Sequence, residues 1–380
     1  FLFNSCSGSE AMHHFFYLCG VETRAWAWYS GVDVFKMNYN HMLNSKMVSA
    51  PCMPAIVNKN YYEYGNYEKN FFLLNKKCDI FFIVRDPISI IKTALNHIDN
   101  MYAWNNFQQD LIYKKITYKN YSFNKLFPKI LYAYSQAYKV NVKDIKKCLD
   151  NHEFYYTLNK RIYMLKNISK NIICVNFEDI KSENIFNTLV KLSERFKFKK
   201  PPEEYRFIFE KRINMYEGLL HLPVTIDIFN IKIIITTPYL FSHSKDDFYK
   251  YQNITKILFE DDFILNNVMI ICERKQVEMF LKNKKWNEFK DYIVAYIDAL
   301  NQYIKEVKTN LVTERDVLSY LKRHKSLSFV FKEYIDENIA YVKKYHPEYL
   351  KTWKYYQEFE KMCEELDGKE DSLKENISNN

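Results

Sequence analysis

The segment from Lys77 to Ile98, KCDIFFIVRDPISIIKTALNHI, constrains the fold more than any other part of the chain. Asp79 to Val84 is a short, mostly apolar run that predicts a buried β-strand. Asp86 and Pro87 then predict a helix start, because aspartate can cap free backbone N–H groups and proline at the first helical position sacrifices no hydrogen bond. Arg85 is therefore expected at the carboxyl end of a strand, where open α/β sheets bind ligands.

Thr93 follows Arg85 by eight residues, about two turns into the predicted helix. An arginine fork and a hydroxyl at this spacing suit a phosphate group, so both residues are candidate ligands. Two other interpretations stay open. Arg85 could form a salt bridge with Asp86 or Glu178, and Thr93 could donate to a carbonyl of its own helix.

The start of the chain has the layout of a phosphate-binding loop. Phe1 to Asn4 predicts a short strand, a loop of small residues follows, and a helical pattern then ends near Cys19 and Gly20. In such a loop, backbone N–H groups and the helix N-terminus can surround an anion, although the same pattern also occurs as a plain helix cap. The candidate anion-binding residues are Ser5, Ser7, Gly8 and Ser9. No GxxxxGK[ST] sequence is present, which disfavours a Walker-type NTPase.

A third strand-to-helix unit spans the residues from Asn171 to Phe196. NIICVN, residues 171–176, predicts a buried strand, and Glu178 and Asp179 after it are expected to cap the next helix or to hold the loop. Repeated β-then-α units predict an α/β fold, a parallel sheet flanked by helices, with a mainly helical C-terminal region.

Domain boundaries are predicted from helix-breaking and polar segments. The prolines of KKPP, residues 199–202, separate a nucleotide-binding core (1–200) from a mixed, then mainly helical, acceptor-side region (201–365). Residues from about 100 to 165 are expected to form a helical insertion or lid, and the polar tail, 366–380, to be disordered. The aromatic cluster at Trp353, Tyr355 and Tyr356 is interpreted as a packing face, with stacking on sugar rings as the alternative.

Charge and composition limit the class of partner. The chain of 380 residues carries a formal net charge of +9, which favours anionic partners, and no RNA-binding motif is present. We expect no nucleic-acid partner and no metal requirement. Eight scattered cysteines without a CxxC pair indicate reduced thiols and a cytoplasmic protein. No apolar run is long enough to span a bilayer, so any membrane contact would be peripheral, at the inner face.

The three strand-to-helix units together resemble the sulfotransferase superfamily over roughly residues 1–200. Ser7-Gly8-Ser9 matches the loop that holds the 5′-phosphosulfate, and Arg85-Asp86-Pro87 with Thr93 matches the binding site of the ribose 3′-phosphate. Phe177-Glu178-Asp179-Ile180 matches the later Tyr-Glu-Asp-Leu segment. This resemblance implies a sulfotransferase-like, P-loop-type fold and a 3′-phosphonucleotide donor as co-substrate, with no permanently bound cofactor.

One position departs from the superfamily pattern. A Lys or Arg usually precedes the Ser-Gly pair and neutralises charge on the transferred group, whereas this chain has Cys6. Sulfuryl transfer would then need another cation, for example Lys92 or a lysine of the insertion. A less negative transferred group would need that cation less.

A second resemblance extends over the whole chain. The opening loop, FFIVRDPISIIKTALNHI and PEYLKTWKYYQEFEKM resemble a family of sugar transferases from bacterial capsule and surface-glycan loci. That family is similar to the capsular O-methyl phosphoramidate transferases. The resemblance implies transfer of a phosphoramidate group from a 3′-phosphocytidine diphosphoramidate to a sugar hydroxyl of capsular polysaccharide. The alternatives are a carbohydrate sulfotransferase, a glycosyltransferase of surface-glycan synthesis and a non-catalytic glycan-binding protein.

Such a transfer needs a base that takes the proton of the attacking hydroxyl. Glu10, His13 and His14 are candidate bases because they follow the phosphate loop directly. Glu10 could instead complement the helix dipole, and the two histidines, on different faces of one helix, could be packed or surface residues. His41 and His97 are weaker candidates, the latter one turn beyond Thr93.

Overall fold

The computed structural model describes residues 1, 4–21, 77–99, 114–117, 127, 129–152, 155–212, 218–228, 230–242, 249–260 and 263–378. The chain divides into two compact units, and each is described by itself. Unit 1 contains residues 1–95, 141–203 and 312–380, and unit 2 contains residues 96–140 and 204–311. The short 3-10 helix η5, Glu203–Tyr205, stands at the boundary.

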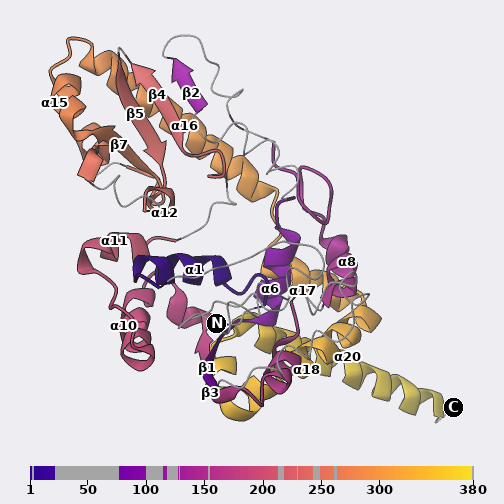
Figure 1. The fold of residues 1–380 in the computed structure, drawn as a ribbon. Helices are drawn as coiled ribbons and strands as arrows, with labels where there is room; N and C mark the ends of the chain where they lie inside the picture. Colours follow the sequence, from indigo (N-terminus) through magenta and orange to yellow (C-terminus); the bar gives the residue numbers. More distant parts are fainter. Residues whose placement is uncertain are drawn as a thin grey trace, which may run out of the picture. The chain divides into compact units, whose positions relative to one another are not determined.

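Unit 1 is built on a parallel pair of strands, β1 and β3 (Figure 1). Its elements are α1 (Ser9–Leu18), β1 (Cys78–Val84), α6 (Pro87–Leu95), η2 (Val142–Asp144), α8 (Ile145–Asp150), α9 (Leu158–Met164), β3 (Ser169–Asn176), η4 (Phe177–Ile180), α10 (Ile185–Phe196), α17 (Glu314–Arg323), α18 (Lys325–Tyr345), α19 (Pro347–Leu350) and α20 (Lys354–Ser378). The last five residues of β1 are all buried, as expected of an apolar strand covered on both faces.

The β1–α6 connection confirms the local prediction. Asp86 Oδ1 accepts hydrogen bonds from the backbone N–H of Ile88 at 2.9 Å and of Ser89 at 3.4 Å, and Pro87 is the first residue of α6. The apolar side of α6 is fully buried, with Ile88, Ile91 and Leu95 at 0% exposure. The capped start and the apolar spacing therefore fix the helix at the carboxyl end of β1.

Unit 2 is a five-stranded sheet with the order β2-β4-β5-β7-β6. Its elements are β2 (Lys114–Thr117), α11 (Arg206–Phe209), β4 (Val224–Ile228), β5 (Ile231–Thr236), α12 (Pro238–Phe241), β6 (Tyr251–Asn253), α14 (Thr255–Phe259), β7 (Met269–Glu273), α15 (Arg274–Leu281) and α16 (Trp286–Thr309). Only the β2–β4 pairing is parallel. The long helix α16 covers one face, where Phe289, Ile293 and Leu300 share a core with the isoleucines of β4, β5 and β7 (Figure 1).

The division of the chain differs from the predicted domains. Residues 312–365, assigned to the acceptor-side region, belong to unit 1 with the strands of the predicted core. The predicted lid is also divided, because residues 96–140 belong to unit 2, where β2 is a strand, and residues from 141 onward belong to unit 1. Local patterns do not show where a chain returns to an earlier unit, since that depends on contacts between residues distant in sequence.

Three further expectations need correction. The tail predicted as disordered continues α20 as far as Ser378, which its Glu- and Lys-rich sequence favours by helix propensity. The insertion expected to be helical from about 100 to 165 also contains a strand, because β2 at Lys114–Thr117 precedes the helices α8 and α9. Phe1 and Asn4 lie outside any strand, and residues 2–3 are outside the described part.

The fold prediction holds at its coarser level. Unit 1 has a parallel strand pair covered by helices, the C-terminal region is mainly helical, and the protein is a mixed α/β structure. Within the described residues, none of the helices has the length and apolar content that a bilayer span requires.

Candidate functional site

Two loops leave the carboxyl ends of the parallel strands side by side. Val84 pairs with Asn176 at the ends of β1 and β3, so Arg85 and Phe177 are the first residues of neighbouring loops. The Arg85 guanidinium lies over the Phe177 ring, 4.2 Å from its centroid. This cation–π contact fixes the arginine at the edge where ligands of α/β sheets bind.

The same guanidinium reaches the opening loop. Nη1 of Arg85 donates to the backbone carbonyl of Cys6 at 2.7 Å, across 79 residues of sequence. The structure thus brings Arg85 and the Ser5–Ser9 loop together. The two carboxylates that the sequence offered as partners of Arg85 have other contacts as well: Glu178 pairs with Lys181 at 2.5 Å, and the carboxylate of Asp86 accepts backbone N–H groups.

The Ser5–Ser9 loop is a tight turn that uses one of its hydroxyls internally. Ser7 is 1% exposed, and its Oγ donates to the carbonyl of Asn4 at 2.6 Å. Cys6 and Gly8 both have positive φ, 63° and 96°. Ser7 therefore shapes the turn and does not present its hydroxyl to a ligand, whereas Ser5 and Ser9 are partly exposed.

Gly8 is required for packing as well as for backbone conformation. A Cβ at this position would lie 2.8 Å from Cδ1 of Ile180 and 2.9 Å from Cε2 of Phe177, closer than side chains tolerate. The loop therefore packs closely against η4. This segment also contains Phe177, whose ring contacts the Arg85 guanidinium. Strand ends, arginine and loop form one packed assembly.

Helix α1 begins at this loop without a side-chain cap. Gly8 is its N-cap, and the first backbone bond into the helix runs from the N–H of Met12 to the carbonyl of Gly8. Among the described residues, no acceptor is recorded for the N–H groups of Ser9, Glu10 and Ala11. Free amides at the positive end of a helix dipole suit an oxyanion.

The Cys6 thiol is not a nucleophile in this arrangement. Burial raises its pKa to about 12, although the charges of Arg85 and Lys92 act in the opposite direction. The thiol is therefore neutral near pH 7. Lys92, which the sequence suggested as a substitute for the missing loop cation, is one of these two charges.

Thr93 lies on the same helix as predicted, but its hydroxyl is engaged locally. Oγ1 donates to the carbonyl of Ser89 at 2.8 Å, the alternative interpretation of this residue. Its partly exposed side chain remains on the face of α6 that also carries Ser89 and Lys92. Lys92 Nζ pairs with Glu314 of α17 at 3.2 Å.

The candidate bases differ in accessibility. His13 and His14 are both buried, at 8% and 4% exposure, and burial lowers the pKa of His13 to about 4. Glu10 reaches solvent, and no hydrogen-bond or ion-pair partner is recorded for it among the described residues. Partial burial by the surrounding protein nevertheless raises the pKa of the Glu10 carboxyl. Of the three, Glu10 alone is exposed to solvent.

His97 and His41 were the weaker candidate bases. His97 follows the end of α6 and belongs to unit 2, where its carbonyl accepts from the N–H of Ala133. The sequence suggested that His97 lies on the helix, but α6 already ends at Leu95. His41 lies outside the described residues. No group of His, Cys, Asp or Glu in the described segments is arranged to hold a metal ion.

The start of α20 is attached to the strand ends, which the sequence did not reveal. Oδ2 of Asp86 accepts from the backbone N–H of Tyr355 at 3.0 Å and of Tyr356 at 3.1 Å. Trp353 Nε1 donates to Asn176 Oδ1 at 3.1 Å. Trp353 and Tyr356 are buried, at 2% and 4% exposure, which confirms the packing interpretation for these two residues, whereas Tyr355 is partly exposed.

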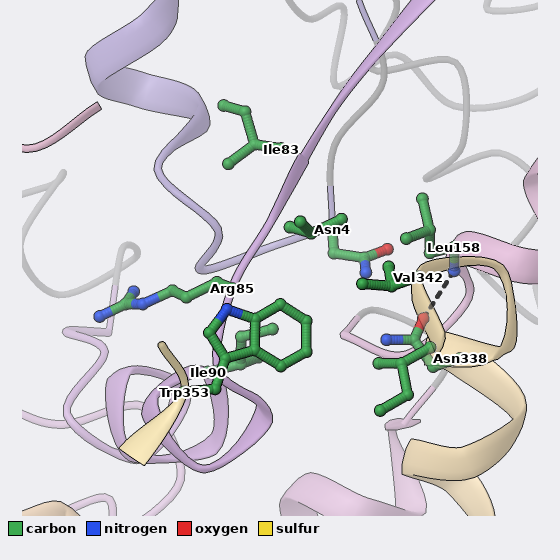
Figure 2. Close-up of a pocket in the computed structure, with 10 residues that line it drawn as sticks. Asn4, Ile83, Arg85, Ile90, Leu158, Asn338, Val342 and Trp353 are labelled. Atoms are coloured by element: carbon green, nitrogen blue, oxygen red, sulfur yellow. Dashed lines mark hydrogen bonds between the residues drawn. The ribbon is translucent and has the colours of Figure 1, made fainter. Parts of the chain in front are cut away.

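A small pocket beneath the strand ends is lined by Arg85 together with apolar and amide side chains. Its lining includes Asn4, Leu158, Asn338 and Trp353, and Asn338 Oδ1 accepts from the N–H of Leu158 at 2.7 Å. Figure 2 shows the Arg85 side chain leading away from the Asn4 and Asn338 amides. Arg85 therefore contributes to the lining of this pocket, and its guanidinium reaches the opening loop.

Comparison with known proteins gives a family without an assigned activity. Residues 174–366, half of the chain, match the family model described as "Protein of unknown function (DUF2972)". The matched part begins within β3 and includes η4, α10, unit 2 from Glu204 onward, and the helices α17 to α19 with about the first half of α20. No curated protein and no solved structure gives a significant match.

Proposed function

Since this protein belongs to the DUF2972 family, whose description assigns no activity, we propose its function from the loop geometry. It is a transferase that moves a phosphoramidate group from a 3′-phosphocytidine diphosphoramidate donor to a hydroxyl of a capsular or other surface polysaccharide. The observation that carries this proposal is the 2.7 Å hydrogen bond from Arg85 to the Cys6 carbonyl, which joins the two halves of the expected donor site. A sulfotransferase-like core is part of the same proposal.

Each part of the donor has a matching set of groups. The free amides at the start of α1 and the hydroxyls of Ser5 and Ser9 hold the diphosphoramidate, with the helix dipole favouring negative charge there. Arg85 binds the ribose 3′-phosphate through its fork, although one of its nitrogens also serves the loop. Thr93 lies beside that phosphate, and its hydroxyl can turn from the Ser89 carbonyl to the ligand.

The transfer step follows from the same placement. The sugar hydroxyl attacks phosphorus in line, the P–O bond to the nucleotide breaks, and cytidine 3′,5′-bisphosphate leaves with the bonding electron pair. Glu10 accepts the hydroxyl proton, since its carboxyl is exposed in the first turn after the loop. The loop amides and nearby cations stabilise the charge on the leaving group.

A carbohydrate sulfotransferase is the second candidate, and one observation favours it. Lys92 acts electrostatically on Cys6, the position where that superfamily has its loop cation, so a lysine from α6 could neutralise a transferred sulfuryl group. In this candidate the donor is a 3′-phosphoadenosine compound. The two functions therefore differ in the expected base of the nucleotide.

A thermal-shift comparison of nucleotides tests the proposal. We expect cytidine 3′,5′-bisphosphate to raise the melting temperature more than cytidine 5′-monophosphate, because binding to the native state stabilises by mass action and the 3′-phosphate adds charge-assisted contacts. Adenosine 3′,5′-bisphosphate is the control for the sulfotransferase, and a nucleotide-sugar with Mn²⁺ is the control for a glycosyltransferase. A larger shift with either control would replace the proposed donor, and no shift with any nucleotide would favour a glycan-binding protein.

A further inference from the structure

The exposed side of α6 carries groups that the donor site leaves unassigned. Ser89 and Lys92 are partly exposed and lie four and seven residues after Arg85, whereas Ile88, Ile91 and Leu95 on the other side are fully buried. Residues three and four apart are neighbours on a helix surface. A hydroxyl and an ammonium group therefore lie next to each other on the exposed side of α6.

The carboxylate of Glu314, from another part of unit 1, contacts both of these groups. Oε1 of Glu314, on α17, accepts from Ser89 Oγ at 3.0 Å and lies 3.2 Å from Lys92 Nζ. The same oxygen receives both contacts, so the carboxylate sits on the two donors as a bound anion would. The side chains of Lys92 and Glu314 keep 22% and 17% exposure, which leaves a route for exchange with solvent.

Helix α17 does not need the Glu314 side chain as a cap. Thr313 and Asp316 form a reciprocal capping box at the start of α17, in which Thr313 Oγ1 accepts from the N–H of Asp316 and the Asp316 carboxylate accepts from the N–H of Thr313. This satisfies the helix start without Glu314. Partial burial acts to raise the pKa of Glu314, but Lys92 and the surrounding hydrogen bonds outweigh it and lower the pKa, so the group is an anion at neutral pH.

We propose that Ser89 and Lys92 form an oxyanion subsite for the 3′-phosphate of the nucleotide, and that the Glu314 carboxylate fills this subsite until the nucleotide displaces it. The inference rests on the proposed donor and adds Ser89, Lys92 and Glu314 to its recognition. Arg85 lies two residues before the first residue of α6, so the helix that carries the subsite starts beside this arginine. A dianionic phosphate competes better for these donors than a single carboxylate.

This exchange has a consequence for selectivity. A ligand must replace an existing ion pair, so part of its favourable interaction with Lys92 offsets the loss of Glu314. A nucleotide without a 3′-phosphate has no group for the subsite and leaves Glu314 in place. Glu314 therefore lowers the affinity for every 3′-phosphonucleotide and leaves affinity for the 5′-monophosphate unchanged.

Isothermal titration calorimetry of the full chain tests this inference with cytidine 3′,5′-bisphosphate and cytidine 5′-monophosphate. We expect Glu314→Gln to tighten binding of the bisphosphate about tenfold, within the usual range of coupling between sites, and to leave the monophosphate unchanged. Glu360→Gln is the matched control, because Glu360 pairs with Lys332 at 2.7 Å in the same unit with comparable exposure. It should change neither affinity.

A second variant keeps the test valid if Glu314→Gln does not fold. Glu314→Asp retains the charge and withdraws the carboxylate by one methylene, so it should tighten bisphosphate binding in the same direction. If the unmutated protein prefers the bisphosphate but neither Glu314 variant changes its affinity, the subsite is wrong and the donor proposal stands. If no variant distinguishes the two nucleotides, the donor proposal fails together with the subsite.

Discussion

Replacement of Asp86 by alanine is expected to lower the free energy of unfolding by about 3 kcal/mol, the sum expected for two lost helix caps and their unsatisfied amides. The carboxylate accepts four backbone hydrogen bonds, from Ile88 and Ser89 in α6 and from Tyr355 and Tyr356 in α20. With 8% exposure at this position, water cannot readily replace the lost acceptors. The chain would lose the connection between the end of β1 and its C-terminal helix.

Denaturant unfolding followed by far-ultraviolet circular dichroism measures this effect. The control is Asp79→Ala, because Asp79 at the other end of β1 is exposed and accepts one hydrogen bond, from Asn171 at 2.7 Å. That control should cost less than about 1 kcal/mol. An equal loss of unfolding free energy in the two variants would show that the Asp86 carboxylate does not cap both α6 and α20.

The charge of Asp86 is not the source of its contribution. Burial raises the pKa of its carboxyl, and the four backbone bonds oppose this only in part. A pKa that is higher in the folded than in the unfolded protein means that stability decreases as the pH rises from the unfolded to the folded pKa. Asp86→Asn keeps one acceptor oxygen, so it should lose about half as much stability as the alanine variant and lack that pH dependence.

Replacement of Glu10 by glutamine is expected to lower the transfer rate by about 10²- to 10⁴-fold, the usual contribution of a general base. The amide is the same size and cannot accept the proton of the sugar hydroxyl. Nucleotide affinity should stay unchanged, since the loop amides and Arg85 hold the donor. The measurement is release of cytidine 3′,5′-bisphosphate from the donor in the presence of polysaccharide acceptor.

The pH profile separates this role from a structural one. Partial desolvation raises the pKa of Glu10 above its ordinary value of 4.5, so kcat/KM should fall as the pH drops through the raised pKa. Glu183→Gln is the control, an exposed glutamate at the start of α10. An unchanged rate in Glu10→Gln would remove the residue from the mechanism.

Local signals predicted the centre of unit 1 because they depend on neighbours in sequence. The apolar run of β1, the Asp86 cap and Pro87 act within a few residues, and the structure has each of them in place. The approach of Arg85 to Phe177 followed from the rule that parallel strands present their carboxyl ends at one edge.

Other parts of the site could not be predicted because they depend on distant packing. The second set of bonds to Asp86 comes from residues about 270 positions later, and the Ser89 to Glu314 contact spans 225 positions. The histidines of α1 were candidates by position, but the aromatic rings around them decide their burial; the ring of Phe1 packs on His13 with centroids 5.4 Å apart. A single sequence gives no measure of these contacts.

The central claim is that Arg85 recognises a 3′-phosphate, and calorimetric titration of Arg85→Ala tests it most directly. In the unmutated protein, cytidine 3′,5′-bisphosphate should bind more tightly than cytidine 5′-monophosphate by about 1.5 to 3 kcal/mol. In Arg85→Ala most of this difference should disappear, while Arg206→Ala, the control in unit 2, should keep it. A difference that survives in Arg85→Ala, or one that is absent from the unmutated protein, would contradict the account.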